Sequence, residues 1–380
     1  MVETSLKIGI SVSMTGRYAL LGRQVLAGIE CYVADVNHIG GMSVGADPKR
    51  LVELIAYDDQ SDTNRCADLV GRLIDRDQVD LLMGPYGSGP SLAAAKVAES
   101  ANVVMWNHSG SADKIFTQGF RWLVGIISPA SNYLRGVLEL VKRRDPLAQR
   151  IAIVSAQTGF ADEVANGARR AAEELGFIVQ SHQRYPSGAT DFASILRDLD
   201  RERPDCLLCV GRVEDDLQLA RKLCASTIPI KSIALVVAAI DQFRAELGNA
   251  ATGFLAPSQW EPDAASIADY GPSAQAFTIA YRSRTSEPLD YPAVQGYAGC
   301  LIAQRCIEMS GTLEQPALRE AANNVQCATL YGAFRIDAST GRQLGHQMLV
   351  TQWQGGQKYI VWPENVANAT VLYPRIEVDE

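Results

Sequence analysis

Residues 81–111, LLMGPYGSGPSLAAAKVAESANVVMWNHSGS, carry the pattern that decides the fold of this chain. The apolar run Leu81–Met83 stops at Gly84, as a buried parallel strand does, and a glycine-rich turn follows it. Residues 91–99 predict an alanine-rich helix with a serine at its start, and residues 103–106 predict the next strand. Two neighbouring parallel strands therefore end in loops of glycines and hydroxyl residues at one edge of a sheet.

These two loops predict an anion-binding site. In an open α/β sheet, ligands bind beyond the carboxyl ends of the strands. Backbone N–H groups at a helix N-terminus and serine hydroxyls together form a donor-rich cradle that suits a small anion. We expect a carboxylate there, held by Ser88, Ser109 and Ser111. The same loops contribute further expected site residues, namely Tyr86, Gly87, Asn107 and Gly110.

The composition favours a globular protein of two lobes. A chain of 380 residues exceeds one ordinary domain. The net charge of −8 and the scattered Lys and Arg residues argue against a nucleic-acid partner, because phosphate binding needs clustered positive charge. No apolar run approaches the roughly 18 residues that span a membrane, so we expect no membrane insertion. We also expect a monomer that uses no cofactor.

The first residues lead almost directly into the first predicted strand and show no signal-peptide pattern. Two interpretations stay open: a cytoplasmic protein, or the mature form of a periplasmic one.

The eight cysteines fall mostly within apolar helical or strand patterns, where cysteine acts as a small hydrophobic residue. Cys206 and Cys209 form a C-x-x-C pair, but they flank two leucines inside a predicted strand. Residues three apart on a strand point to opposite faces, so we expect neither a shared metal nor a disulfide. The cysteines do not reveal the redox compartment.

Strand and helix patterns alternate along the chain in two series, which predicts an α/β fold with two doubly wound parallel sheets. The first series starts with a strand at 6–12 and a helix at 21–37, and the second includes strands at 206–210 and 233–237. The tail alternates with period two, and Gly355-Gly356 predicts a hairpin turn there.

The order of these motifs resembles a known family. The matching stretches are IGISVSMTGRYALLGRQVLAGIECYVADVN at the start, YDDQSD, MGPYGSGPSLAAAKVAE, VVMWNHSGSAD, AIVSAQTGFADEVANGARRAAEELG, and YGAFRID with VTQWQGGQKYIVWP near the end. In this order they resemble the type I periplasmic solute-binding proteins of the leucine/isoleucine/valine-binding kind, over nearly the whole chain. Each motif alone is weak, but the ordered set is fairly specific.

The resemblance implies two lobes, joined by three crossings, that close on a small ligand. The crossings are expected at 124–128, 255–259 and 334–337. Lobe one is then 1–125 plus 260–334, and lobe two is 126–259 plus 335–380.

The resemblance also implies roles for single residues. The family holds the ligand carboxylate through positions that match Ser88 and Ser111, with backbone groups of Ser109 and Gly110. An aromatic residue of lobe two commonly covers the ligand, and Phe160 takes that position. Tyr18 and Tyr86 are expected to line the wall of lobe one, and Trp260 extends the aromatic lining.

One departure from the family bears on the ligand. Amino-acid binders of this kind place an acidic side chain of lobe two against the ammonium group. Here the matching stretch is the apolar run 236–240, with Asp241 and Glu214 as the open candidates for an acid. A buried ammonium without a partner costs several kcal/mol. A carboxylate without an ammonium, such as an aromatic acid, therefore fits somewhat better, with Arg212 as a second anion contact.

Several of these residues also have purely structural interpretations. Ser88 suits the N-cap of the helix, and Phe160 suits a hydrophobic staple. Trp106 at the end of a buried strand suits the core, and Arg212 suits a surface ion pair with Glu214 or Asp216.

Catalytic motifs are missing from the sequence. Residues 87–90, GSGP, lack the third glycine of a dinucleotide fingerprint, and neither a phosphate loop nor a nucleophile elbow occurs. The four histidines have no metal-ligand spacing, and adjacent residues such as His108 and Ser109 rarely face each other. We therefore expect no enzyme.

The function expected from all these features is a periplasmic receptor of an ABC importer that captures a small carboxylate and presents it to the membrane permease. The ligand classes left open are branched-chain amino acids, aromatic amino acids and aromatic acids. The alternative is a cytoplasmic or periplasmic sensor on the same fold, with an amide- or urea-type ligand.

Overall fold

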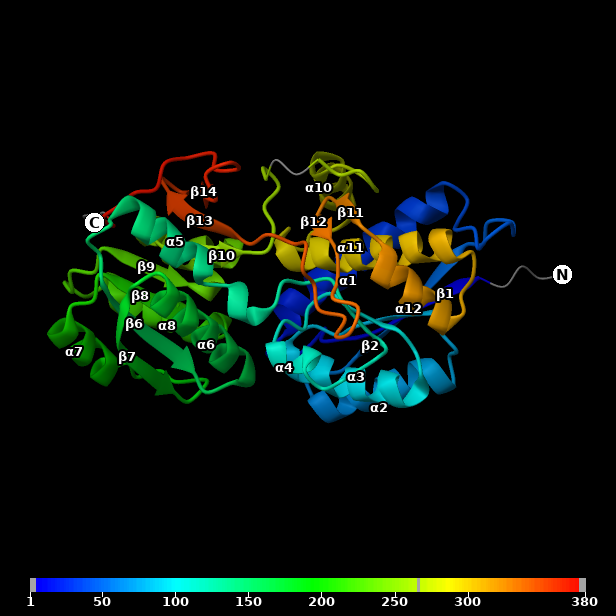
Figure 1. Cartoon of the computed structure of the whole chain (residues 1–380), viewed down its shortest axis with the longest axis horizontal. Coiled ribbons are helices and arrows are strands. Elements are labelled where there is room, and N and C mark those ends of the chain that lie inside the picture. Colours follow the sequence, from blue (N-terminus) through cyan, green and yellow to red (C-terminus); the bar gives the residue numbers. More distant parts are fainter. Residues whose placement is uncertain (1–4, 265–266, 376–380) are drawn as a thin grey trace. The chain divides into compact units, whose positions relative to one another are not determined.

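The computed structural model describes residues 5–264 and 267–375. The described residues group into two units (Figure 1). The first unit takes its residues from Met1–Pro129 and Ser266–Gln347, and the second from Ala130–Ala265 and Met348–Glu380. The chain thus divides after each expected crossing. Residues 126–129 and 335–347, which we expected in lobe two, group with the first unit, and residues 260–264, which we expected in lobe one, group with the second.

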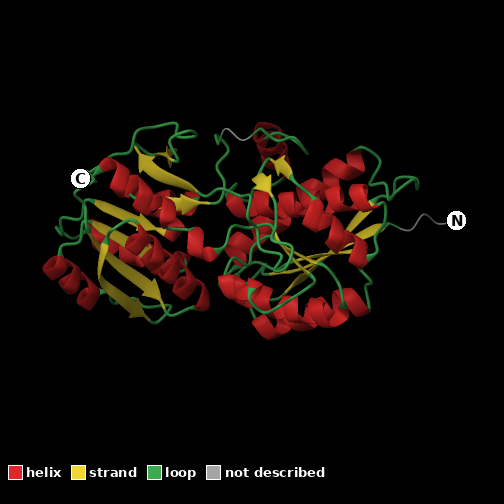
Figure 2. Ribbon diagram, in the orientation of Figure 1, coloured by secondary structure: helices red, strands yellow, loops and turns green. Residues whose placement is uncertain are grey.

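The first unit is built on a five-stranded sheet in the order β2-β1-β3-β4-β5, and every neighbouring pair is parallel. The strands are β1 (Leu6–Val12), β2 (Val52–Asp58), β3 (Leu81–Met83), β4 (Met105–Asn107) and β5 (Leu123–Gly125). Helices cover both faces of this sheet (Figure 2), as a doubly wound fold requires. The predicted fold class is confirmed for this unit.

The helices of the first unit divide between the two faces of the sheet. On one side lie α2 (Thr63–Asp75), α3 (Ser88–Ala101) and the short α4 (Asp113–Phe116), and on the other α1 (Ala19–His38), α11 (Tyr291–Ser310) and α12 (Gln315–Asn324) (Figure 1). Helix α10 (Ala274–Arg284) and a hairpin of β11 (Cys327–Thr329) and β12 (Gly332–Phe334) complete the unit.

The second unit contains a seven-stranded sheet in the order β14-β13-β10-β9-β8-β6-β7. The strands are β6 (Arg150–Ala156), β7 (Ile178–Tyr185), β8 (Cys206–Val210), β9 (Ser232–Leu235), β10 (Leu255–Ser258), β13 (Leu349–Gln354) and β14 (Gln357–Trp362). Strands β6 to β10 pair in parallel, whereas β13 is antiparallel to both of its neighbours. The predicted hairpin turn at Gly355-Gly356 joins β13 to β14, as expected.

The core of the second unit is formed by these strands and by α5 (Arg135–Arg144), α6 (Gly159–Glu174), α7 (Ala193–Glu202), α8 (Val213–Cys224) and α9 (Asp241–Leu247). Cys206 and Cys209 are buried in β8, and all eight cysteines are free thiols. Burial raises the pKa of the Cys206 thiol to about 12, so this thiol stays protonated at neutral pH.

One predicted strand is too long. Residues 233–237 were expected to form a strand, but β9 ends at Leu235 and Val236–Ala239 form a 3₁₀ turn, η2. The N–H of Val237 donates to Asp216 Oδ2 at 3.3 Å instead of to a neighbouring strand. The apolar sequence suits burial in either conformation, so periodicity could not separate the two.

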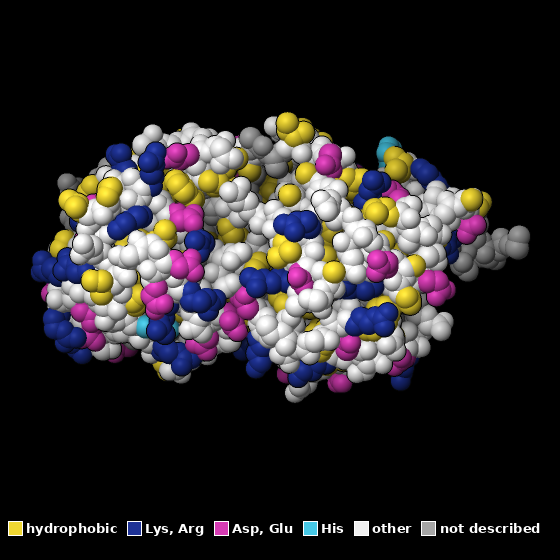
Figure 3. All heavy atoms as spheres, viewed as in Figure 1, with side chains coloured by type: hydrophobic (Ala, Val, Ile, Leu, Met, Phe, Trp, Pro, Cys, Tyr) yellow, Lys and Arg dark blue, Asp and Glu magenta, His cyan; other side chains and the backbone are white. Residues whose placement is uncertain are grey.

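Two further features are the length and polarity of the helices and the distribution of charge on the surface. Over the residues that the structure describes, none of the helices is long and apolar enough to cross a membrane. On the face shown in Figure 3, acidic and basic side chains are interspersed over both units.

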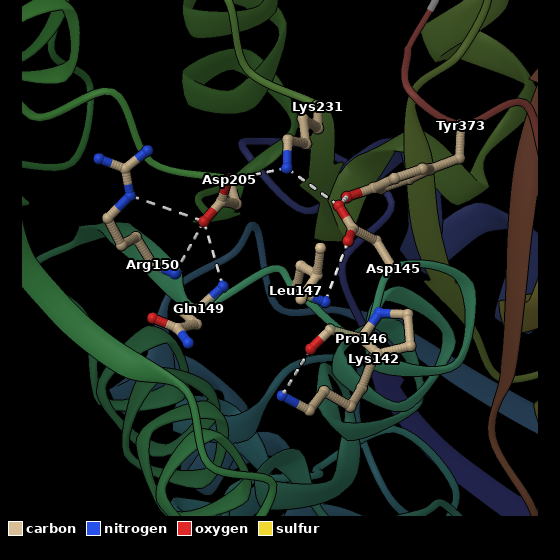
Figure 4. A network of polar contacts seen from close by, with 9 residues as sticks. All are labelled: Lys142, Asp145, Pro146, Leu147, Gln149, Arg150, Asp205, Lys231 and Tyr373. Carbon is tan, nitrogen blue, oxygen red and sulfur yellow. Dashed lines mark hydrogen bonds and ion pairs between the residues drawn. The ribbon is translucent and has the colours of Figure 1, made fainter.

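A polar network closes the amino ends of the second sheet (Figure 4). Asp205, just before β8, accepts the N–H groups of Gln149 and Arg150 at 3.1 and 3.0 Å. Lys231, just before β9, bridges Asp145 at 2.9 Å and Asp205 at 3.1 Å. The hydroxyl of Tyr373 donates to Asp145 at 2.8 Å. Four separate segments are thereby held at the edge opposite to the one where ligands bind in such folds.

Lys231→Met is expected to weaken this network. The hydrogen bond from Lys231 lowers the pKa of Asp145, and N–H groups of Arg150 and Gln149 overcome the effect of burial to lower that of Asp205. Both carboxylates therefore stabilise the fold above the unfolded pKa of 3.8, and this contribution is lost as pH falls through their lower folded values. Because Lys231 is 42% exposed, we expect a loss of only about 1 kcal/mol near pH 7.

Urea unfolding near pH 7 and near pH 3 measures this effect. The variant should lose stability near pH 7 and differ less from the wild type near pH 3. Lys222→Met, at an exposed lysine without an ion pair among the described residues, is the control. An equal loss at both pH values would contradict the electrostatic explanation.

Candidate functional site

The expected site residues of the first unit lie at the carboxyl edge of its sheet. Strand β1 is hydrogen-bonded to both β2 and β3, and β3 to β4, so the direction of winding reverses between β1 and β3. Such a reversal is where open α/β sheets bind ligands. The loops after β1, β3 and β4 all begin at this edge, and together they carry the serines and tyrosines predicted from the sequence.

The loop after β3 positions Ser88. Gly87 has φ +93°, a conformation that favours glycine, and it serves as the N-cap of α3. The helix starts at Ser88, so the interpretation of Ser88 as the N-cap is wrong. Its hydroxyl instead accepts the N–H of Ala112 at 3.1 Å, which ties the loop after β3 to the loop after β4. The hydroxyl proton of Ser88 is still available for a ligand.

The loop after β4 is shaped by Asn107 and Gly110. The Asn107 side chain is buried, donates to the carbonyl of Gly110 and accepts the N–H of Gly110, both at 2.8 Å. A Cβ atom at residue 110 would overlap the side chain of Ser91 on α3. These hydrogen bonds link the Asn107 side chain to both backbone groups of Gly110, so the two residues hold the loop in place.

His108 and Ser109 form a pair that the sequence did not predict. Imidazole Nδ1 lies 2.7 Å from the Ser109 hydroxyl, so the expectation that these adjacent side chains do not meet is wrong. His108 is fully buried, and burial lowers its pKa to about 4. A neutral ring of such low basicity accepts a proton poorly at neutral pH. The pair therefore suits hydrogen bonding better than nucleophilic catalysis.

Ser111 is the unsatisfied donor of this edge. Its side chain is almost fully buried, yet neither its hydroxyl nor its backbone N–H forms a hydrogen bond with any residue that the structure describes. The next residue is Ala112, whose N–H bonds to Ser88, so Ser111 and Ser88 belong to the same part of the edge. Two hydroxyl donors and free backbone N–H groups match the two oxygens of a carboxylate.

Two tyrosines stand beside this cradle. Tyr18, after β1, and Tyr86, after β3, are half-buried, and their rings meet edge to face with centroids 6.1 Å apart. Both were expected in the wall of the first lobe. The structure brings them together at the point where the winding reverses.

The YDDQSD motif supports the loop that carries Tyr18. Asp58 accepts the N–H of Met14 at 2.9 Å and the Thr15 hydroxyl at 2.7 Å. Asp59 is buried and accepts the Ser13 hydroxyl at 2.5 Å. These carboxylates fix the path of the loop after β1, a role that spacing in the sequence alone did not reveal.

The second unit has its own carboxyl edge, where the winding reverses between β6 and β8. Phe160 follows β6 as the second residue of α6, whose N-cap is Thr158. The hydrophobic-staple interpretation needs a residue before the N-cap, so it is wrong. The half-buried Phe160 ring packs against Tyr133, with centroids 5.5 Å apart.

Arg212 follows β8 and stands at the start of α8, half-buried. Its N–H donates weakly to Asp215 at 3.4 Å. Asp216 is fully buried, so the proposed surface ion pair between Arg212 and Asp216 is wrong. Trp260 follows β10 and is largely buried, and its carbonyl accepts the Ser258 hydroxyl at 2.9 Å. Trp106 is fully buried in β4, as expected for a core residue.

The described residues hold no group of three or more His, Cys, Asp or Glu side chains that could bind a metal ion. The donors described above at the two carboxyl edges are hydroxyls, N–H groups and the guanidinium of Arg212. This chemistry suits an organic anion.

The chain matches the family described as periplasmic binding protein over residues 5–358. It belongs to the periplasmic binding protein family. A Leu/Ile/Val-binding protein homolog from Brucella abortus is 22% identical, over 98% of this chain and 95% of the relative. The suspected relationship to the leucine/isoleucine/valine-binding proteins is thereby confirmed.

Two solved structures place the fold among the type I periplasmic binding proteins. The solute-binding protein of an ABC transporter from R. palustris, in complex with benzoate, has a TM-score of 0.79 at 20% identity, covering 94% of this chain and 96% of that one. The substrate-binding protein of a branched-chain amino acid transporter from Streptococcus pneumoniae, in complex with isoleucine, has a TM-score of 0.80 at 18% identity, covering 98% and 100%. These likenesses show a shared fold.

Gly110→Ala is expected to disrupt the edge of the first unit. The new methyl group would overlap Ser91, so the loop after β4 must shift, at a cost of about 1–3 kcal/mol in unfolding free energy. Thermal unfolding measures the loss. Gly71→Ala in α2 is the matched control, because nothing lies within 4 Å of its added Cβ, and alanine favours the helix. A Gly110→Ala variant as stable as the control would show that the close approach does not constrain the loop.

Proposed function

We propose that this protein is the solute-binding receptor of an ABC importer and that it captures a small carboxylate. The observation that carries the proposal is the cradle of the first unit, in which Ser88 and Ser111 offer hydroxyl donors at the edge where the winding reverses. The family supports a receptor role. Proteins of the same fold are named as complexes with benzoate and with isoleucine, both of which carry a carboxylate.

The acids of the second unit favour a ligand without an ammonium group. Asp215 is committed to its own loop, since it accepts the Ser187 hydroxyl at 3.0 Å and the N–H of Gly188 at 2.7 Å. Asp241 lies 3.9 Å from Lys358, and Glu214 is exposed. A buried ammonium needs an ionised partner that is buried with it to offset its desolvation, and water screens an exposed acid such as Glu214. We therefore favour a simple or aromatic carboxylic acid over an amino acid.

We further propose that three residues of the second unit contact the ligand, namely Phe160, Arg212 and Trp260. Phe160 and Arg212 follow adjacent strands of the sheet, at the edge where its winding reverses. An aromatic ring suits an apolar or aromatic ligand body, and a guanidinium suits a carboxylate. Closure of the two units follows if the ligand binds better to the closed state than to the open one.

The remaining parts of the proposal follow from this role. The protein would act in the periplasm as a monomer, without catalysis, and would hand its ligand to the membrane permease of the importer. Turnover of a bound compound would contradict it.

Ser111→Ala is expected to lower carboxylate affinity by roughly 10- to 100-fold. A hydrogen bond to a charged group contributes about 1.5–3 kcal/mol, and each 1.4 kcal/mol is a factor of ten. Isothermal titration with benzoate, 4-hydroxybenzoate, isoleucine, acetamide and urea identifies the ligand class first. The variant is then titrated with the tightest carboxylate.

Ser100→Ala is the matched control, since Ser100 is exposed on α3 and its hydroxyl bonds to Lys96 within the same helix. Unchanged affinity in Ser111→Ala would remove the cradle from the site. Binding of an amide or urea, with no carboxylate bound, would favour the sensor alternative.

Arg212→Gln is expected to weaken carboxylate binding by about tenfold, because it removes a charge-assisted donor while the side-chain length stays similar. The same titrations at low and high salt check this, and the loss should shrink as salt increases. Arg170→Gln, at an exposed arginine of α6 in the same unit, is the control for net charge. Equal affinities of the two variants would exclude Arg212 from the site.

A further inference from the structure

Asp216 is a buried acid that the proposed function does not use. It lies in the first turn of α8, and its side chain has no exposed surface. Its Oδ2 accepts the N–H of Val237 from η2 at 3.3 Å. Its Oδ1 has no hydrogen-bond partner among the described residues, although the N–H of Gly211 approaches the same carboxyl group. A buried carboxyl oxygen without a partner is costly.

Tyr185 presents a second unsatisfied oxygen. It is the last residue of β7, it is 4% exposed, and its ring packs edge to face on Phe192 with centroids 5.1 Å apart. Its hydroxyl has no hydrogen-bond partner among the described residues. Burial, followed by the nearby charge of Asp216, raises its pKa, so the hydroxyl keeps its proton.

Gly211 shows that these two oxygens face the same point. A Cβ atom added at Gly211 would lie less than 3.0 Å from both Asp216 Oδ1 and the Tyr185 hydroxyl. The two oxygens are therefore within twice that distance of each other, yet they form no direct hydrogen bond. One atom that bonds to both at about 2.8 Å fits this spacing. The absence of a side chain at residue 211 keeps the approach open.

We propose that Asp216 and Tyr185, next to Gly211, bind a single water molecule inside the second unit. Buried waters bridge polar groups that have no protein partner, typically with about three hydrogen bonds. The carboxyl group and the phenol hydroxyl supply two of these, while the N–H of Gly211 is already directed at the Asp216 carboxyl group. The bound water joins the end of β7 to α8, and Asp216 extends the link to η2 through Val237.

The protonation of Asp216 agrees with this site. Burial raises its pKa to about 8, so the carboxyl group is mostly neutral at pH 7. A neutral carboxyl donates its proton to the water, and the water accepts it. The same neutrality means that Asp216 does not act as the acid partner of an ammonium group. The water site is independent of the ligand and of the proposed function.

A crystal structure of the wild-type protein at high resolution tests the site directly. The expected result is an ordered water within hydrogen-bond distance of both Asp216 Oδ1 and the Tyr185 hydroxyl. A direct hydrogen bond between the two side chains, or no density at this point, would overturn the proposal.

Tyr185→Phe gives a thermodynamic test that does not depend on crystals. If the hydroxyl binds a water, its removal loses a hydrogen bond, and the melting temperature should fall by a few degrees. If the hydroxyl has no partner, its removal relieves a buried unsatisfied group, and the melting temperature should rise. A rise would contradict the water site.

Gly211→Ala tests how closely Asp216 Oδ1 and the Tyr185 hydroxyl approach residue 211. The methyl group would take the place next to both oxygens, so this variant should melt below the wild type. Gly159→Ala in α6 is the matched control, because nothing lies within 4 Å of its added Cβ. Equal melting temperatures for these two variants would show that the two oxygens do not lie this close to residue 211, which contradicts the geometry on which the proposal rests.

Discussion

The close approach of Gly110 to Ser91 is the constraint on which the first unit's polar edge depends. This contact packs the loop after β4 closely against α3, and Asn107 stabilises the loop through two hydrogen bonds to Gly110. Only with the loop in this place does the N–H of Ala112 reach the hydroxyl of Ser88. Ser111, the residue before Ala112, is thereby held in the same part of the edge as Ser88, where we propose that the ligand binds. Such preorganisation reduces the entropy that binding must overcome.

The second unit separates its charges between two edges of one sheet. At the amino ends, Lys231 joins Asp145 and Asp205 in a network that holds four segments together (Figure 4). At the carboxyl ends, Asp216 is buried, Asp215 bonds to its neighbouring loop, and Glu214 is exposed, while Arg212 stands at the start of α8. Charge pairs thus hold the amino edge, while the opposite edge, where we propose that the ligand binds, carries Arg212 and aromatic rings. This division favours an anionic ligand.

The sequence predicted the structure best in stretches with one clear hydrophobic periodicity or one residue that ends a helix or strand. The run 6–12, LKIGISV, places an apolar residue at every second position, and it forms β1 as predicted. The start of α3 was placed too late, at Ser91, because Gly87 rather than a serine caps the helix. Helix α12 was not predicted, since its short polar pattern over 315–324 carries a weak signal. Propensity is a weak prior that tertiary contacts override.

The residues of the candidate site divide in the same way. Serines after parallel strands could be found from order alone, because the carboxyl ends of such strands meet at one edge. The roles of Asn107 and Gly110 could not, since they depend on contacts across the loop. The pairing of His108 with Ser109 and the burial of Asp216 also depend on the packed structure. No pattern in the sequence distinguishes these residues from ordinary loop and helix positions.

The central claim is that the first unit holds the carboxylate of the ligand through Ser88 and Ser111. A crystal structure with the tightest-binding carboxylic acid tests it most directly. We predict that the two carboxylate oxygens lie within hydrogen-bond distance of these hydroxyls and of nearby backbone N–H groups. A ligand whose carboxylate points away from both serines would contradict the claim, even if the affinity were high.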